Sequence, residues 1–173
     1  MMPLLRKLST PFFLLIISIC VSIPVFAFQN EPDGFRGIKW GTNISELPEM
    51  SLSEDRGDSK FYLRKGDKLK IGDADIDRIG YGFYKGLFYS VGIMYNGSLN
   101  FKKLKAIFVE QYGQAQQQKQ FGEHYSWLGE TVKIAVRYNE IAKNGDIWYV
   151  FKPLEKEQEK DDEQKAKKGA KDL

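Results

Sequence analysis

ADIDRIGYGFYKGLFYSVGIMY, residues 74–95, is the stretch of sequence that decides the fold. It contains two long apolar segments separated by Lys85-Gly86, and a glycine-containing pair between such segments is typical of a tight β-hairpin turn. We therefore predict one strand over 74–84 and a second over 87–95. A two-residue turn places Tyr84 opposite Leu87 and continues the pairing outward from there.

The predicted pairing gives this hairpin two apolar faces. One face carries Tyr84, Leu87, Tyr89, Val91, Ile93 and Tyr95, and the other carries Ile79, Tyr81, Phe83, Phe88 and Met94. Gly80 and Gly82 then lie opposite Val91 and Tyr89, and an aromatic ring lying across a strand glycine stabilises such a pair. A single helix covers one face of a sheet, so the second face needs another cover.

Two interpretations of the second face stay open. In the first, the N-terminal segment 35–47 or the curvature of the strands buries it. In the second, some of the aromatic side chains line a groove, because an exposed apolar patch usually marks a binding site. The candidate ligand or partner surface then consists of Trp40, Tyr81, Phe83, Phe88, Tyr89 and Trp127.

One main helix is predicted after the hairpin, over Phe101–Tyr112. Asn100 is its predicted N-cap, and Gly113 stands just past its end, where a glycine is favoured. Its apolar residues fall on one stripe at helical spacing, namely Phe101, Leu104, Ile107, Phe108 and Tyr112. Near the N-terminus, Asn43 with Glu46 three residues on predicts a short helix over 44–47.

The remaining segments complete an α+β pattern. Residues 51–59 are predicted to be a charged loop and 114–120 a glutamine-rich connector. Further strands are predicted over 60–63, 125–128, 131–138 and 147–151, with a turn at 144–146. In the segment 131–138, apolar and polar residues alternate, which is typical of a half-buried antiparallel strand. The fold class is therefore α+β, a largely antiparallel sheet of about six to seven strands with the main helix Phe101–Tyr112 and a short N-terminal helix.

Residues 1–27 have the three parts of a secretory signal peptide. Arg6 and Lys7 give a positive start, 12–21 is an apolar run, and Val25-Phe26-Ala27 fits a peptidase site. We predict cleavage between Ala27 and Phe28, hence a periplasmic or secreted protein that meets the membrane only during export. An uncleaved anchor and a lipid-modified Cys20 are the alternatives.

The rest of the chain divides in two by composition. Residues 28–152 predict a single globular domain, whereas 153–173 hold mainly acids and lysines and predict a disordered or frayed-helical tail. Cleavage also removes Cys20, the only cysteine, so the exported chain has neither a disulfide nor a thiol. The exported chain keeps 24 basic and 23 acidic residues, a balance that does not favour nucleic acid as a partner.

No catalytic residue, metal site or cofactor is predicted. Asp73, Asp75 and Asp77 resemble the start of a calcium loop, but Arg78 stands where that loop needs glycine, so a solvent-facing strand edge is the preferred interpretation. His124 is the only histidine and lacks the partners of a zinc site. Motifs for a serine nucleophile or a phosphate-binding loop are absent. The tryptophans Trp40, Trp127 and Trp148 are suited to stacking on sugars or a peptide, although core packing is the commoner use.

The segment FRGIKWGT, residues 35–42, resembles the F-x-G-I-x-W-G-T opening of a group of small exported bacterial proteins of unknown function. The segment Phe108–Gly113, a helix ending in Tyr-Gly, and the following strand with Trp127 are similar too. This resemblance implies an exported compartment and a small-domain architecture. It brings no catalytic residues with it.

These observations together predict a non-enzymatic accessory or binding module of the bacterial envelope, with an envelope protein or a glycan as its partner. A carboxylate-dependent hydrolase acting on a cell-wall polymer is the alternative, since two acids can converge from distant positions in the sequence. An inhibitor-like or chaperone-like protein, which also works through its surface alone, is a third hypothesis. A cleft with paired acids of raised pKa favours the enzyme, and an aromatic groove without such groups favours the binder.

Overall fold

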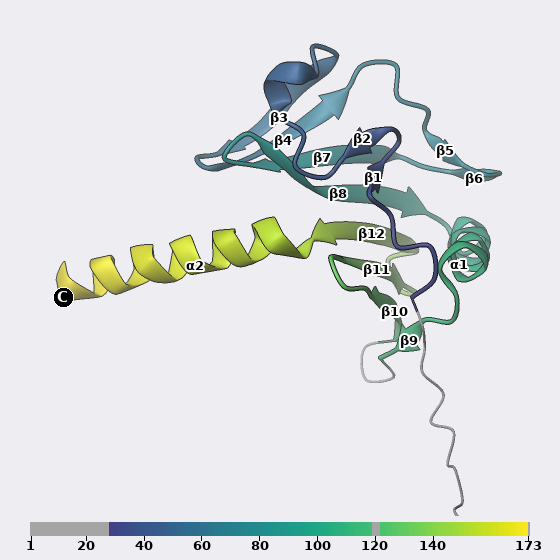
Figure 1. Cartoon of the computed structure of the whole chain (residues 1–173). Helices are drawn as coiled ribbons and strands as arrows, with labels where there is room; N and C mark the ends of the chain where they lie inside the picture. The colour runs from purple at the N-terminus through teal and green to yellow at the C-terminus, as the bar shows by residue number, and fades with distance from the viewer. Residues whose placement is uncertain (1–27, 119–121, 173) are drawn as a thin grey trace, which may run out of the picture.

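The computed structural model describes residues 28–118 and 122–172 (Figure 1), so the predicted signal peptide lies outside the described residues. Eight strands make up the main sheet: β3 (Met50–Arg56), β4 (Ser59–Arg64), β7 (Arg78–Tyr84), β8 (Leu87–Asn96), β9 (Gln116–Gln117), β10 (Glu123–Leu128), β11 (Val132–Asn139) and β12 (Asn144–Phe151). Two small ribbons flank it, β1 (Gly34–Phe35) with β2 (Ile38–Lys39) and β5 (Lys70–Ile71) with β6 (Ala74–Asp75). The helices are α1 (Ser98–Tyr112) and α2 (Lys152–Gly169), with 3₁₀ turns η1 (Ile44–Glu46) and η3 (Ala170–Asp172).

The main sheet is antiparallel throughout and confirms the α+β class in its broad form. Its strand order is β3-β4-β7-β8-β12-β11-β10-β9. Each half of the chain thus forms a meander that runs from one edge of the sheet to its centre. The last strands of the two meanders, β8 and β12, pair with each other in the middle. Each meander also follows a helical segment, η1 in the first half and α1 in the second.

The strand count is higher than predicted because two segments expected to be irregular are strands. Residues 51–59 were expected to form a charged loop, but most of them form β3, which pairs with β4. A pair of residues in the glutamine-rich connector forms β9, which pairs with β10. Both are edge strands, where charged side chains are common because they discourage pairing with another chain.

The central hairpin has the predicted turn but a different register. Lys85 and Gly86 both have positive φ, as a type I′ turn requires, and Tyr84 pairs with Leu87. A bulge then leaves Tyr89 without a partner, because Phe83 pairs with Phe88 and Gly82 with Ser90. The predicted pairing of Gly80 and Gly82 with Val91 and Tyr89 is therefore wrong. Gly80 pairs with Gly92 instead.

This bulge gathers most of the hairpin's apolar side chains on one face. Beyond it, Val91, Ile93 and Tyr95 change sides and join the core cluster that also contains Tyr81 and Phe83. One face of the sheet is therefore the core face, and the glycines of β7 and β8 lie on the other, which we call the open face. The bulge thus replaces the two apolar faces of the predicted hairpin by a core face and a glycine-rich face.

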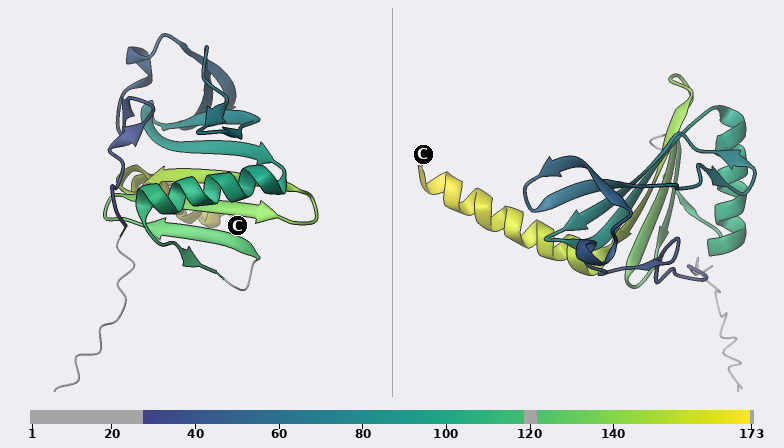
Figure 2. Two further views of the ribbon diagram at one scale, coloured as in Figure 1. Left: turned by 90° about the vertical axis from the view of Figure 1, so that its right-hand side faces the viewer. Right: turned by 90° about the horizontal axis from the view of Figure 1, so that it is seen from above.

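The core face has two covers. Helix α1 lies across it (Figure 2) and buries Phe101, Leu104, Phe108 and Tyr112. The N-terminal segment covers the rest: Phe35 packs against Tyr81 and Tyr149, and Trp40 stacks on Phe88. Residues 35–47 were expected to cover the second face, but they lie on the same face as the helix.

Local details around α1 and β12 differ from the predictions. Helix α1 begins at Ser98 after Gly97, and the side-chain oxygen of Asn100 accepts the N–H of Asp75 instead of capping the helix. The turn expected at 144–146 lies at 140–143, and residues 144–146 belong to β12. The glycine Gly145 is needed inside that strand because a Cβ there would overlap the ring of Tyr95. The alternation over 131–138 is confirmed, with Val132, Ile134, Val136 and Tyr138 buried.

The charged C-terminal segment forms α2, a continuous helix, where a disordered or frayed tail was predicted. It starts directly after β12 with Pro153 in its first turn and runs away from the sheet on the side opposite to α1 (Figure 2). Only Leu154 is buried. Contacts with distant residues hold the helix: Lys165 bonds Asp58, and Asp161 bonds Lys85. None of the helices within the described residues is both long and apolar enough to cross a membrane.

Candidate functional site

The six aromatic residues predicted to form a ligand surface are mostly in the core. Tyr81, Phe83, Phe88 and Trp127 are at most 2% exposed, and Tyr89 is 7% exposed. Trp40 is half-buried between Phe88 and Phe151, and its indole N–H donates to the carbonyl of Pro32. Four of the six, Trp40, Tyr81, Phe83 and Phe88, lie together on the core face. Trp127 packs under the end of α1, and Tyr89 lies on the open face.

The open face carries a hollow between β3–β4 and β12, which we call the trough. Its volume is about 340 Å³, and it crosses the middle of β7 and β8. Its lining residues are Glu54, Arg56, Phe61, Arg78, Gly80, Gly92, Met94 and Trp148. None of these eight residues belongs to the six predicted for the ligand surface.

The floor of the trough consists of Gly80 and Gly92, which pair with each other across β7 and β8 but have different surroundings. A Cβ on Gly92 would lie 2.9 Å from the ring of Trp148, so the indole occupies the space that a side chain would need. A Cβ on Gly80 would meet nothing nearer than the carbonyl oxygen of Gly92, 3.9 Å away. Neither glycine has a positive φ. Packing against Trp148 therefore explains why residue 92 is a glycine. Gly80 faces open space, so packing does not require a glycine there, although glycine is unfavourable within a strand.

The apolar walls of the trough stand apart from the hydrophobic core. Trp127 is part of the main core cluster and Trp40 packs against it, but Trp148 belongs to neither of the two clusters, and nor do Phe61 and Met94. The indole N–H of Trp127 donates to Gly113, whereas that of Trp148 has no partner among the described residues. Trp148 thus lines the trough with its ring and keeps an indole N–H without a partner among the described residues.

Two arginines give the trough a positive character. The Nε of Arg56 donates to Glu54 at 2.7 Å, and its guanidinium lies 5.4 Å from the centroid of the Phe61 ring. Arg78 donates one hydrogen bond, to the hydroxyl of Ser53 at 2.6 Å, and it has no ion pair within the described part of the chain. Arg78 is therefore the one trough arginine whose charge is not balanced by a neighbouring carboxylate.

Helix α2 closes one end of this surface. A second hollow, of about 220 Å³, lies between α2 and the β3–β4 hairpin and shares Arg56 and Phe61 with the trough. Leu154 packs there against Tyr84 and Tyr89. Burial, together with a hydrogen bond to Asp161, raises the pKa of Tyr84 to about 12, so its hydroxyl stays protonated. The two hollows adjoin each other on the open face, with Arg56 and Phe61 in the lining of both.

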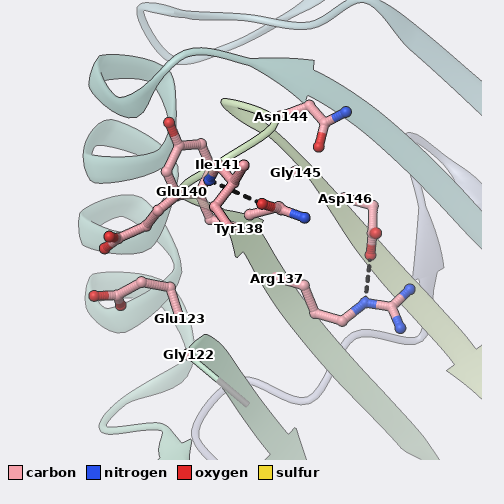
Figure 3. Close-up of a pocket in the computed structure, with 10 residues that line it drawn as sticks. Gly122, Glu123, Arg137, Tyr138, Glu140, Ile141, Asn144, Gly145 and Asp146 are labelled. Carbon is pink, nitrogen blue, oxygen red and sulfur yellow. Dashed lines mark hydrogen bonds and ion pairs between the residues drawn. The ribbon is translucent and has the colours of Figure 1, made fainter.

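The largest hollow, of about 710 Å³, lies at the tip of the β11–β12 hairpin (Figure 3). Arg137 and Asp146 form an ion pair at 2.7 Å on one side, while Glu123 and Glu140 extend in the other direction. Ile141 at its rim is 94% exposed. This hollow borders Gly122, directly after residues 119–121, which the structure does not describe.

The displaced pKa values of the acids do not point to a hydrolase. Where a carboxyl group has a displaced pKa, as in Glu31, Asp55, Asp73 and Asp161, the pKa is lowered. The acids of the calcium-like motif are engaged separately: Asp73 with Lys103, Asp75 with Lys70, and Asp77 with the amide of Asn96. His124 lies beside Arg137, and burial followed by that positive charge lowers its pKa. No group of three metal-binding side chains is found among the described residues.

The start of the predicted exported chain is tied down next to α1. Phe28 packs edge-on against Tyr112, with ring centroids 5.5 Å apart. The carboxylate of Glu31 accepts hydrogen bonds from the backbone N–H groups of 130–132 and from the hydroxyl of Thr131. Burial raises the pKa of Glu31, but these hydrogen bonds together outweigh it, so the pKa is lowered overall. This segment is a structural strap and takes no part in the trough.

Comparison of the chain with protein-family models, with curated proteins and with solved structures found no match. The resemblance of residues 35–42 to small exported proteins therefore stays a prediction. The trough left two traces in the sequence: Trp148, which is suited to stacking, and the glycines Gly80 and Gly92 inside strands that are otherwise rich in aromatic residues.

Proposed function

We propose that this protein is an exported, non-enzymatic binding module of the bacterial envelope, and that its ligand lies in the trough on the open face. The observation that carries the proposal is the combination of Gly80, which faces open space, with Trp148, which lies outside both core clusters. Glycine in a strand weakens the sheet unless something must approach the backbone closely. A ligand in the trough supplies that reason.

The chemistry of the trough suits binding better than catalysis. It combines an aromatic ring, a free indole N–H and two arginines, which are groups that orient a ligand. Its one carboxylate, Glu54, is paired with Arg56. The alternative, a carboxylate-dependent hydrolase, requires two acids facing a common substrate, and the trough supplies one. The export of the protein rests on residues 1–27 and is part of the proposal.

The three tryptophans offer a direct test by NMR. Their indole N–H groups give three signals in the exported chain, residues 28–173, labelled with ¹⁵N-tryptophan, and the variant Trp148→Phe assigns the one from the trough. The labelled protein is titrated separately with soluble glycan, lipid and peptide fractions of a bacterial envelope.

Binding in the trough moves the Trp148 signal and leaves those of Trp40 and Trp127 in place, because both of these are hydrogen-bonded within the protein. The variant Ile141→Ser, which changes an exposed apolar residue outside the trough, should respond like the wild type. Binding that moves Trp40 or Trp127 and leaves Trp148 unchanged would refute the assignment of the site. Release of soluble products from a cell-wall fraction by the purified protein would favour the hydrolase.

A further inference from the structure

The trough also limits the class of its ligand, provided that it is the ligand site proposed above. The second hollow beside α2 adjoins it and shares Arg56 and Phe61 in its lining. The second hollow is lined by polar groups such as Asp58, Ser59 and Gln158. Two adjoining hollows, one with a ring platform and one lined by polar groups, fit a chain of small polar units better than one compact molecule.

A peptide is a poor occupant because the trough lies in the interior of the sheet. Strands β7, β8 and β12 each have hydrogen-bonded neighbours on both sides, so their main-chain groups are already paired. A peptide gains most of its affinity for a sheet by pairing with a free edge, and the strands of the trough floor offer none, since the edge strand β3 lies at the wall of the trough. A peptide lying across the trough would leave its own N–H and C=O groups to water or to the few side chains present.

A fatty acyl chain is a poor occupant for a different reason. Only Phe61, Met94 and Trp148 present apolar side chains to the trough, and charged groups stand between them. Met94 is itself 40% exposed, so the hollow is open to water. Apolar ligands gain affinity from the surface that they remove from water, and most of an acyl chain would stay wet here.

A sugar ring matches the arrangement of groups. Its C–H face can stack on the Trp148 ring above the glycine floor, because indole offers an apolar face and one polar edge. Its hydroxyl groups then reach the indole N–H, the Arg56 guanidinium and the Glu54 carboxylate, which together offer both donors and an acceptor. Gly80 leaves room for the ring beside the indole.

Arg78 adds a charge requirement. Its guanidinium has five N–H donors and gives one hydrogen bond to Ser53, so its other donors are available for a planar anion. Arginine binds carboxylates through two parallel hydrogen bonds, which fix orientation as well as adding affinity. We infer that the ligand is an acidic oligosaccharide, with one sugar ring stacked on Trp148 and a carboxylate of the chain paired with Arg78.

The experiment compares an acidic sugar with its neutral counterpart. Isothermal titration of the exported chain uses the α-1,4-linked trimer of galacturonic acid and the methyl ester of the same trimer, in which the carboxylates are masked. We expect the free acid to bind about tenfold more tightly, a difference of about 1.4 kcal/mol. The variant Arg78→Gln should remove this difference and leave the weaker binding of the ester unchanged. The tenfold preference should also shrink as salt is raised, because Arg78 is exposed.

Arg137→Gln is the matched control, since Arg137 is an exposed arginine outside the trough that already pairs with Asp146. It should bind both sugars like the wild type. Equal affinity of the wild type for acid and ester, or an equal loss of both in Arg78→Gln, would overturn the acidic class.

Failure of both trimers to bind, while a lipid or peptide fraction moves the Trp148 signal, would overturn the sugar class and leave the proposed binding function standing. The variant Gly80→Val tests the site itself, because its side chain fills the trough. Full affinity of that variant for the acidic trimer would overturn the trough as the site, and with it the proposed function.

Discussion

Alanine at the two paired glycines of the trough floor should have opposite effects on stability. Gly80 and Gly92 face each other in one β-ladder pair, so they share sheet, pairing and strand environment. In Gly80→Ala the new methyl group enters open space, and its nearest neighbour lies 3.9 Å away. Replacing such a glycine restricts the unfolded chain and should stabilise the protein by about 0.4–1 kcal/mol.

The same change at Gly92 meets the tryptophan ring. Three ring atoms of Trp148 lie 2.9–3.2 Å from the position of the new methyl group, so the indole must move. Overpacking of this kind costs about 1–3 kcal/mol, which offsets the gain from the restricted unfolded chain. We therefore expect Gly92→Ala to be less stable than Gly80→Ala by about 1–3 kcal/mol.

Urea unfolding of the exported chain, followed by circular dichroism, measures both variants with the wild type. The double variant Gly92→Ala with Trp148→Ala tests the cause, since removing the ring should remove the cost of the added methyl group. The reasoning is refuted if Gly80→Ala destabilises the protein as much as Gly92→Ala does. In that case the floor is packed at both positions and the trough is filled.

Three further predictions concern the strap, the C-terminal helix and the chain end. Glu31→Gln should destabilise the protein by about 1 kcal/mol at neutral pH, because a charged acceptor of four hydrogen bonds is lost from a partly exposed site. The pKa of Glu31 is lower in the folded protein than the unfolded value of 4.5, so this stabilisation is present above pH 4.5 and is lost as the pH falls through the folded pKa. The urea midpoints of the variant and the wild type should therefore converge in acid. Lys85→Ala should speed amide hydrogen exchange over residues 157–169, because Lys85 forms ion pairs with Glu157 and Asp161 of α2. High salt should also speed this exchange, because it screens the ion pairs. The control variant Lys160→Ala removes a lysine without an ion pair among the described residues and should leave the exchange unchanged. N-terminal sequencing of the exported form should find Phe28 first, and a chain starting at Met1 or Cys20 would show that the predicted cleavage site is wrong.

The central hairpin shows how far the sequence alone leads. The turn at Lys85-Gly86 follows from local chemistry, because few residue pairs adopt two successive positive φ values. The bulge at Tyr89 does not follow from local chemistry. It decides which side chains of β8 face the core, and the core depends on the helix and the N-terminal segment that pack there. Because Tyr89 is unpaired, every later side chain of β8 lies on the face opposite to the predicted one.

Trp148 was named from the sequence as suited to stacking, but its place on the open face was not predicted, for a related reason. Every residue from Ile147 to Phe151 is apolar, so a period of two does not show which ones face the core. The sequence predicted a disordered or frayed-helical tail over 153–173. It did not show what holds α2, because the partners are distant in the sequence: Lys165 bonds Asp58, and Asp161 bonds Lys85. The strand β3 was missed because its charged side chains face water on an edge, where pairing with β4 decides its conformation.

The most direct test of the trough as the ligand site is a paired titration of the wild type and Gly80→Val with the envelope fraction that moves the Trp148 indole signal. Both proteins should give the same far-UV circular dichroism, since the space beside Gly80 is open. We predict that the Trp148 signal moves in the wild type and stays in place in Gly80→Val. An equal response of that signal in both proteins would contradict the account, because the ligand would then not need the trough.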